Sequence, residues 1–206
     1  MMQDVPTRFC RALPEDVPAL KSLWAEVFGD EPAFIDLFFS RMFRPEDYVL
    51  LRHDETDEIL SAAALLPVDL VCGETRFPIS YLYGMMTRPS EQGKGYGLRL
   101  LQHAAQYCRE NGKAGIALQP ADEGLLYFYK KAGYAPAFSR VPNPSCYIGY
   151  PPYFLEFAKE AGYKVPPAQS AQGDPSDGET AMVPGVFLSF RQELRPENAW
   201  LAYPLD

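Results

Sequence analysis

The sequence predicts an α/β fold in which a mixed, mostly antiparallel central sheet is flanked by helices. Two observations lead to this fold class. Three strand-like segments follow one another with short polar turns between them, which is the pattern of an antiparallel meander. The stretch after them alternates helices with strands and opens on a glycine-rich turn. The chain has 206 residues, enough for a single domain over 1–206 with a substantial core.

One strand and two helices are expected before the meander. Thr7–Leu13 forms the strand, and Pro14-Glu15-Asp16 leads into a helix that Gly29 ends. Apolar residues recur along that helix at helical spacing, namely Val17, Leu20, Trp24 and Val27. Pro32 starts the second helix. One side of the second helix carries Phe34, Leu37, Phe38 and Met42.

The meander itself is expected at Tyr48–His53, Ile59–Cys72 and Phe77–Thr87, with turns at residues 54–57 and 73–74. Pro89–Gly97 is the glycine-rich turn that comes next. It opens a helix with an apolar stripe, and Asn111-Gly112 ends that helix because glycine accepts the left-handed conformation. The stripe consists of Leu98, Leu101, Ala105 and Cys108. The next elements are the strand Ala114–Gln119, the helix Glu123–Ala132 with Asp122 as N-cap and Gly133 at its end, and the strand Tyr134–Val141.

The last third of the chain gives weaker patterns. Pro152–Ala161 is expected to be a helix that Gly162 stops. Val165–Thr180 is rich in Pro, Gln, Ser, Gly and Asp, which predicts a long loop or an insertion over 165–180. Val186–Phe190 and Trp200–Tyr203 are two short strands that could pair with each other.

Composition excludes several classes of protein. The net charge of −8 argues against a nucleic-acid partner, because binding a duplex requires a basic face. No apolar run approaches the ~20 residues that cross a bilayer, and no secretory leader opens the chain, so a cytoplasmic location without a membrane is expected. The cysteines form no C-x-x-C pair, so reduced, buried thiols are expected rather than a disulfide framework, and no metal site. They are Cys10, Cys72, Cys108 and Cys146.

The strongest chemical motif is Gln92-Gly93-Lys94-Gly95-Tyr96-Gly97, which lies between a strand and a helix. Glycines let a ligand approach the main chain closely, and the first N–H groups of the helix point outward without partners. Such a helix start attracts phosphate, so a cofactor with a pyrophosphate is expected. The spacing fits neither a Walker loop nor a dinucleotide fingerprint. A glycine-rich hairpin turn without a ligand is the structural alternative.

The spacing Q-x-x-G-x-G resembles the coenzyme A pyrophosphate loop of GNAT acetyltransferases. Phe128-Tyr129-Lys130-Lys131-Ala132-Gly133-Tyr134 resembles the F-Y-x-K-x-G-F segment of that family, with Tyr134 in place of the last Phe. The resemblance is clear over 77–138, looser over Arg8–Cys72, and fades after Val141. The chain is also similar, more loosely, to the enhanced-intracellular-survival type of acetyltransferase, which is longer and has a further domain that this chain is expected to lack.

The resemblance implies the fold and the acyl-donor site. Tyr81–Thr87 takes the place of the family's central fourth strand, which splays from Ala114–Gln119 and leaves a gap for the pantetheine arm. The donor is acetyl-coenzyme A, and Tyr129 faces its sulfur. The implied contacts of this cofactor are Met85, Met86, Thr87, Gln92, Gly93, Lys94, Gly95, Tyr96, Gly97, Leu98 and Tyr129.

The implied reaction is N-acetyl transfer by direct attack of a primary amine on the thioester. The expected acceptor is a small-molecule or peptide amine. A free thiol has a pKa of about 8.5 and a tyrosine about 10, so a protonated Tyr129 can donate to the departing thiolate. The amine must also lose a proton to a base. The acidic candidates for this base are Glu26, Asp30, Glu31, Asp69 and the terminal carboxylate at Asp206. In the looser relatives the chain terminus reaches the active site, which favours testing Asp206, and a frayed terminus is the structural alternative.

Alternatives stay open at this point. A non-catalytic acyl-coenzyme A binding module or sensor would keep the glycine loop and could lose the tyrosine, whereas Tyr129 is present here. A nucleotide-binding protein is disfavoured by the loop spacing. Tyr147, Tyr150 and Tyr153 could line an acceptor pocket for a cationic or aromatic amine, or only pack under the C-terminal loop. Whether the chain forms a homodimer is also open.

Overall fold

The computed structural model describes residues 6–138, 146–163, 185–191 and 201–202. The chain divides into two compact units, and each is described by itself. Unit 1 consists of Met1–Leu66 and Leu82–Tyr107, and unit 2 of Pro67–Tyr81 and Cys108–Asp206. Three elements run from one unit into the other, namely strands β3 (Ile59–Cys72) and β4 (Thr75–Thr87) and helix α3 (Tyr96–Glu110).

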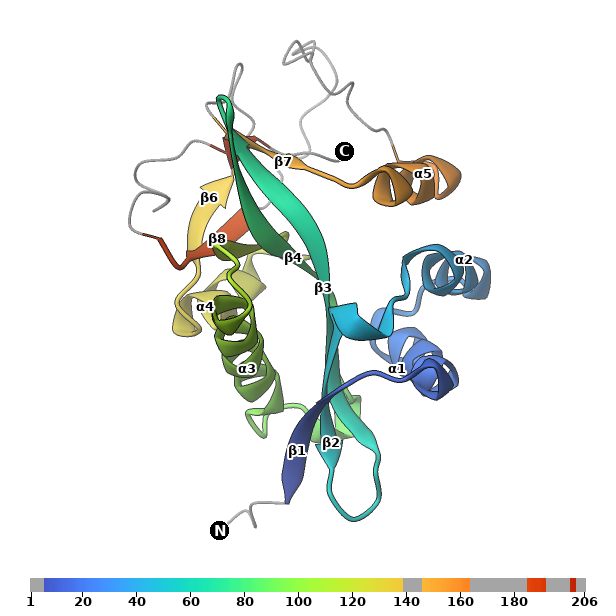
Figure 1. The fold of residues 1–206 in the computed structure, drawn as a ribbon. Coiled ribbons are helices and arrows are strands. Elements are labelled where there is room, and N and C mark those ends of the chain that lie inside the picture. Colours follow the sequence, from blue (N-terminus) through green and yellow to red (C-terminus); the bar gives the residue numbers. More distant parts are fainter. Residues whose placement is uncertain (1–5, 139–145, 164–184, 192–200, 203–206) are drawn as a thin grey trace. The chain divides into compact units, whose positions relative to one another are not determined.

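The sheet of unit 1 is the expected meander. β1 (Thr7–Arg11) pairs antiparallel with β2 (Tyr48–His53), and β2 pairs antiparallel with β3. β2 is buried along almost its whole length because helices lie on both faces of the sheet: α1 and α2 on one side and α3 on the other (Figure 1). The strand boundaries agree with those expected from the sequence to within two residues, which confirms this part of the prediction.

Helices α1 (Val17–Phe28) and α2 (Pro32–Met42) build an aromatic core in unit 1. Trp24 is its centre, with its ring 4.6 Å from that of Phe38 and 6.0 Å from that of Tyr83. Gly29 ends α1 in the left-handed conformation, as expected. The buried side of α2 differs from the expected one, since Phe34 and Leu37 are only half-buried. Its buried residues are Ile35, Phe38, Phe39 and Met42.

Unit 2 extends the sheet through long-range pairings. β4 pairs parallel with β5 (Gly115–Leu118), β5 antiparallel with β8 (Gly185–Ser189), and β8 antiparallel with β6 (Ala135–Phe138). β7 (Cys146–Gly149), which the sequence did not predict, pairs antiparallel with β3. The predicted pairing of the last two strands is wrong: β8 pairs with β5 and β6, and β9 (Leu201–Ala202) pairs with β6 and β7. The mixed, mostly antiparallel α/β class is confirmed.

The helices of unit 2 lie where their boundary residues indicated. α4 (Gly124–Lys131) starts after Asp122, whose Oδ1 accepts a hydrogen bond from the Leu125 N–H at 3.1 Å. α5 (Pro152–Glu160) starts at a proline, and Gly162 follows it with a φ of 83°. The predicted loop or insertion at 165–180 lies outside the described residues.

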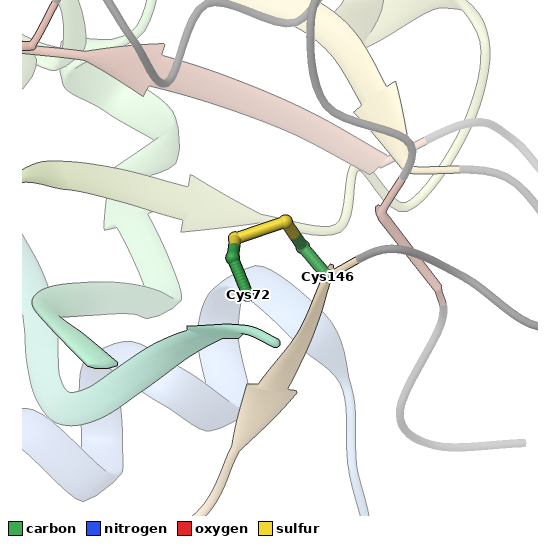
Figure 2. The surroundings of a disulfide bond; sticks show 2 residues. All are labelled: Cys72 and Cys146. Atoms are coloured by element: carbon green, nitrogen blue, oxygen red, sulfur yellow. A yellow bond between two sulfur atoms is a disulfide. The ribbon is translucent and has the colours of Figure 1, made fainter. Parts of the chain in front are cut away.

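The expectation of four reduced cysteines is wrong for one pair. Cys72 at the end of β3 and Cys146 at the start of β7 form a disulfide across 74 residues (Figure 2). The antiparallel register places these two residues directly opposite each other, with their Cα atoms 4.2 Å apart. The sequence could not reveal the pair because β7 itself was not predicted. Cys10 and Cys108 are not disulfide-bonded, and the Cys108 thiol donates to the Ser80 hydroxyl at 3.3 Å.

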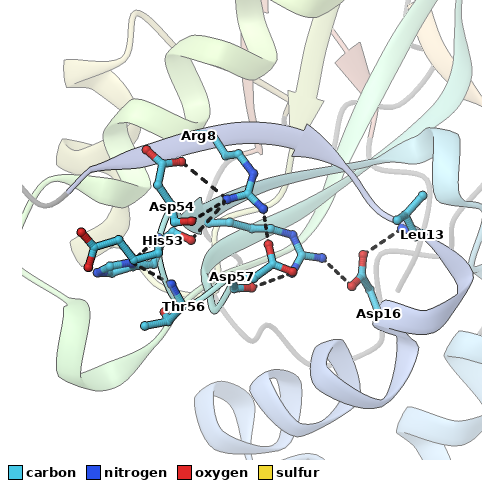
Figure 3. A network of polar contacts seen from close by, with 9 residues as sticks. Arg8, Leu13, Asp16, His53, Asp54, Thr56 and Asp57 are labelled. Carbon is cyan, nitrogen blue, oxygen red and sulfur yellow. Dashed lines mark hydrogen bonds and ion pairs between the residues drawn. The ribbon is translucent and has the colours of Figure 1, made fainter.

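A polar network fastens the turn between β2 and β3 (Figure 3). Arg52 is 7% exposed and forms an ion pair with Asp16, which is 8% exposed. Arg52 also donates to the Asp57 backbone carbonyl at 2.8 Å, and Arg8 from β1 forms a second ion pair with Asp57. The turn is therefore tied both to β1 and to the residues that precede α1.

No helix in the described part of the chain is long and apolar enough to cross a membrane.

Candidate functional site

The glycine-rich motif forms an exposed loop between a 3₁₀ turn at Pro89–Glu91 and helix α3 in unit 1. Gly93 and Gly95 have φ angles of 78° and 83°, a region that other residues rarely adopt. A Cβ at either position would meet nothing within 4 Å, so the backbone conformation rather than packing requires glycine there. The Lys94 ammonium forms an ion pair with Glu91 at 2.9 Å beside the loop.

The loop exposes a continuous run of backbone donors. The Gln92 N–H donates to the Pro89 carbonyl at 3.3 Å, and the Arg99 N–H donates to the Gly95 carbonyl at 3.0 Å. Between them, the N–H groups of residues 93–98 have no hydrogen-bond partner among the described residues. They stand at the N-terminus of a 15-residue helix, whose dipole favours negative charge. The residues present therefore fit a diphosphate group.

At two of the predicted loop contacts, Tyr96 and Leu98, a ligand could be bound by the backbone but not by the side chain. Tyr96 is 5% exposed, so its side chain anchors the start of α3 in the core and only its backbone N–H faces outward. Leu98 is half-buried in the same turn. Both residues therefore offer a ligand their main chain, which is the same chemistry that Gly93, Gly95 and Gly97 offer.

The end of β4 adjoins this loop within unit 1. The Gln92 amide Nε2 donates to the Thr87 carbonyl at 3.2 Å, so the structure brings these two predicted site residues together. Ser61 on β3 donates its hydroxyl to the Met86 carbonyl at 2.7 Å and lies 2.9 Å from the Thr87 hydroxyl. Met86 is 1% exposed and belongs to the core, whereas Met85 is half-buried. Ser61 is thus a supporting residue that no sequence pattern indicated.

β4 also contains a backbone irregularity that sequence reasoning missed. Gly84 has a φ of 55° inside the strand, three residues before its end. Trp24 of α1 lies against it, so that a Cβ at this position would be 2.6 Å from the indole ring. The Trp24 indole N–H in turn donates to the Asp30 carboxylate at 2.7 Å. An isolated glycine inside a strand pattern was the available indication of such a distortion.

Tyr129 lies on α4 in unit 2 and is 7% exposed. Burial, and secondly the negative charge of Asp122, raise the pKa of Tyr129 to about 12. The phenol is therefore fully protonated at neutral pH. Its ring meets those of Phe128 and Tyr134 edge to face, with centroid distances of 5.3 and 5.8 Å, which restricts where its hydroxyl can point.

Tyr134 occupies the position where the F-Y-x-K-x-G-F segment has a phenylalanine. Its side chain is 2% exposed, and its hydroxyl has no hydrogen-bond partner in the described part of the chain. Burial first, and then the neighbouring Cys108 and Tyr129, raise its pKa well above the ordinary value. Compared with a phenylalanine, Tyr134 therefore adds a buried hydroxyl that makes no hydrogen bond within the described residues.

The candidate bases are dispersed. Glu26 forms an ion pair with Arg88 at 3.2 Å, and Asp30 accepts the Trp24 bond. Asp69 in unit 2 lies 3.6 Å from Arg76. Glu31 is exposed at the start of α2, where its backbone carbonyl accepts hydrogen bonds from the first turn. Asp206 lies outside the described residues. In the described ranges, no group of three or more His, Cys, Asp or Glu side chains could hold a metal ion.

Comparison with known proteins places these features in one family. The family model described as an acetyltransferase (GNAT) domain matches residues 9–137, more than half of the chain. A search of curated proteins found no match. Many solved structures share the fold.

Three of these structures illustrate the likeness. A GCN5-related N-acetyltransferase from Anabaena variabilis is 22% identical, with a TM-score of 0.57 over 64% of this chain and 32% of its own. Eis1 from Mycobacterium abscessus is 15% identical, with a TM-score of 0.53 over 64% of this chain and 32% of its own. A GNAT family acetyltransferase from Brucella melitensis, crystallised with acetyl-CoA, is 16% identical, with a TM-score of 0.55 over 73% of this chain and 99% of its own. At these identities the likeness shows the fold alone. The chain spans about a third of the length of the first two.

Proposed function

The chain belongs to the family of GNAT acetyltransferase domains, and on this premise we propose that it transfers an acetyl group from acetyl-CoA to a primary amine. The observation that carries the proposal is the run of unpaired N–H groups at residues 93–98, at the start of α3. A diphosphate bound there would receive several hydrogen bonds together with the favourable end of the helix dipole. The acceptor that we propose is the amine of a small molecule or of a peptide.

The backbone of β4 is proposed to hold the pantetheine arm. The Met86 carbonyl already accepts from Ser61, and the Thr87 carbonyl accepts from Gln92. These bonds hold the strand end in one conformation and leave Met85 as the residue best able to offer backbone groups to an extended ligand. In the family the same strand supplies the N–H that stabilises a developing oxyanion, and we assign that task to this segment.

Tyr129 is proposed to act on the leaving sulfur. Acetyl-CoA supplies an activated thioester, whose thiolate leaves when the amine attacks. The Tyr129 pKa of about 12 keeps the hydroxyl protonated and makes complete proton transfer to a thiolate unfavourable, because an ordinary thiol has a pKa of about 8.5. The hydroxyl therefore acts as a hydrogen-bond donor that stabilises the departing sulfur, and the proton follows as the thiol is released.

The amine must lose a proton before or during attack. Asp206 is the proposed carboxylate for this step, and Asp30 is the alternative within the described residues. The indole bond to Asp30 would fix the orientation of its carboxylate, whereas the other oxygen stays available for a water molecule. Activity of a variant without Asp206 and of Asp30→Asn over a range of pH distinguishes the two assignments, because removing Asp206 takes away both its side-chain carboxylate and its α-carboxylate.

Titration and turnover test the proposal in two stages. Isothermal calorimetry with acetyl-CoA, ATP and NAD tests the loop assignment, and we expect binding of acetyl-CoA alone. Thiol release from acetyl-CoA in the presence of a panel of cationic, aromatic and neutral amines then tests catalysis. Binding without thiol release for every amine, including peptide amines, would favour an acyl-CoA-binding module. Absence of acetyl-CoA binding would overturn the proposal as a whole.

A further inference from the structure

Strand β7 is attached to the sheet of unit 2 by few contacts. It has four residues and pairs with β3 in a register that runs from Asp69 opposite Gly149 to Cys72 opposite Cys146. Its other neighbour in the sheet, β9, has only two residues. The disulfide closes the end of the β3–β7 ladder that lies farthest from α5, at the residue where β7 begins. The covalent bond therefore fixes the register of a strand that otherwise pairs with β3 over only four residues and with β9 over two.

The position of β7 determines where the next residues of the chain lie. Tyr150 comes directly after the strand, stacks on Phe154 of α5 at 4.4 Å and meets Tyr81 of β4 edge to face at 5.9 Å. Residues of β3, β4 and β7 together line a groove of about 340 Å³, which includes Asp69, Arg76 and Tyr150. If β7 left β3, the groove would lose one wall and the contact between the two tyrosine rings would break.

Reduction of the pair would place no charge in the core. Cys146 is 6% exposed and belongs to an apolar cluster with Val68, Leu70 and Ile148. A neutral thiol behaves as a small apolar side chain, so reduction leaves no buried charge in this cluster. Cys72 is only half-buried and precedes the exposed hairpin turn at Gly73, which gives a reductant access from this side. A bond of this kind can open and close without unfolding the cluster around it.

We propose that the Cys72–Cys146 disulfide is a redox-sensitive clasp that fixes β7 on β3. A dithiol reductant supplies two electrons and two protons, leaves as its own cyclic disulfide, and converts Cys72 and Cys146 into thiols. The reduced chain keeps the apolar cluster, but β7 then depends on its backbone pairing and on the packing of Ile148 and Cys146, and it opens more often. Disulfides in reducing compartments are commonly transient and redox-sensing, and this pair has the accessibility for that role.

Hydrogen exchange on the full chain tests the clasp. Non-reducing peptide mapping of protein equilibrated with glutathione disulfide should recover the Cys72–Cys146 peptide pair. Addition of dithiothreitol should speed amide exchange in residues 146–149 on the order of a hundredfold, whereas exchange in β5 at 115–118 should stay unchanged. Cys72→Ser should exchange at the reduced rate with or without dithiothreitol. Cys10→Ser is the matched control, because it removes a free thiol in unit 1 and should respond like the parent chain.

Each outcome is decisive. Two alkylatable thiols at Cys72 and Cys146 after equilibration with glutathione disulfide would overturn the proposal. Equal amide exchange of residues 146–149 in the two redox states would also overturn it. Loss of protection throughout unit 2 on reduction would overturn it as well, because the bond would then be required for folding. None of these readouts depends on acetyl transfer, so the inference stands or falls separately from the proposed function.

Discussion

The indole ring of Trp24 lies against the α-carbon of Gly84, so closely that a Cβ there would be 2.6 Å from the ring. The contact joins α1 to the C-terminal part of β4 at a point where the strand adopts a φ of 55°. Backbone geometry in β4 therefore depends on a side chain of the first helix.

Gly84→Ala should destabilise the protein by about 2–4 kcal/mol, because it combines left-handed strain with overpacking against a buried ring. Gly73→Ala is the matched control. Gly73 has a similar φ of 59°, but a Cβ there meets nothing within 4 Å, so its loss should be about 1 kcal/mol. Urea unfolding of both variants measures the difference. Equal losses would mean that Trp24 moves aside at little cost.

Gly95→Val should abolish measurable CoA binding while the protein stays folded. The side chain would cover the N–H groups at the start of α3 and disturb the left-handed turn that presents them. Gly112→Val, at the opposite end of the same helix, imposes the same kind of strain at a φ of 72° and also meets nothing within 4 Å. Calorimetry should find normal CoA affinity for Gly112→Val. Unchanged affinity in Gly95→Val would end the phosphate-loop assignment.

Tyr129→Phe should lower kcat roughly 10²–10³-fold with little change in CoA affinity, because it removes the hydrogen-bond donor to the departing sulfur. Its melting temperature should change little, since one hydrogen bond contributes about 1 kcal/mol. Tyr134→Phe is the control, because the Tyr134 hydroxyl has no partner among the described residues, and its kcat should be unchanged. Pre-steady-state measurement of acetyl transfer removes the ambiguity that slow product release introduces. A normal rate of acetyl transfer in Tyr129→Phe would mean that Tyr129 has only a packing role in the core.

The raised pKa of Tyr129 predicts how activity and stability respond to alkaline pH. Burial favours the neutral phenol, so its contribution to stability is complete below pH about 10 and is lost as the pH rises from about 10 towards about 12. The rate of acetyl transfer should therefore show no decline from Tyr129 up to pH 10, where an ordinary tyrosine is half ionised. A pH–rate profile beside that of Tyr129→Phe measures this. A descending limb near pH 10 that the variant lacks would contradict the assignment.

Arg52→Ala should lower the free energy of unfolding by about 3–5 kcal/mol, because it leaves the buried Asp16 carboxylate without its partner. Arg8→Ala removes an ion pair to the same turn, but this one is solvent-exposed and should matter by less than about 1 kcal/mol. Chemical denaturation of both variants separates the two contributions. A small effect of Arg52→Ala would indicate that solvent reaches the Asp16 carboxylate at no great cost once the guanidinium is gone.

Local sequence patterns predicted helices and strands correctly where polar turns or glycines lie at their ends. Tyr48–His53 and Ile59–Cys72 were correct because polar turns bound each apolar run, and Gly29 and Gly162 marked helix ends through their left-handed conformations. The glycine loop and the Tyr129 segment were likewise visible as short motifs, and their assignment to an acyl-donor site stays a prediction. Local patterns failed for β7, whose four residues form a strand only because β3 offers them an edge.

Properties that depend on which distant residues meet in the fold could not be predicted from the sequence. The partners of β8 and the disulfide depend on which distant segments meet, and no spacing in the sequence records that. The pKa of Tyr129 depends on its burial and on Asp122 seven residues earlier. The role of Gly84 required knowing that Trp24 lies above it.

The boundary between the two units passes through the interiors of β3, β4 and α3 rather than through linkers. The units are therefore not modules that recombination or cloning could separate, since separating them would break two strands and a helix. The same feature makes insertions in these strands costly. One residue added to β3 near Pro67 would turn every later side chain of the strand to the opposite face and carry Cys72 out of register with Cys146. Insertions and deletions in related sequences should accordingly occur in the turns and not in β3, β4 or α3.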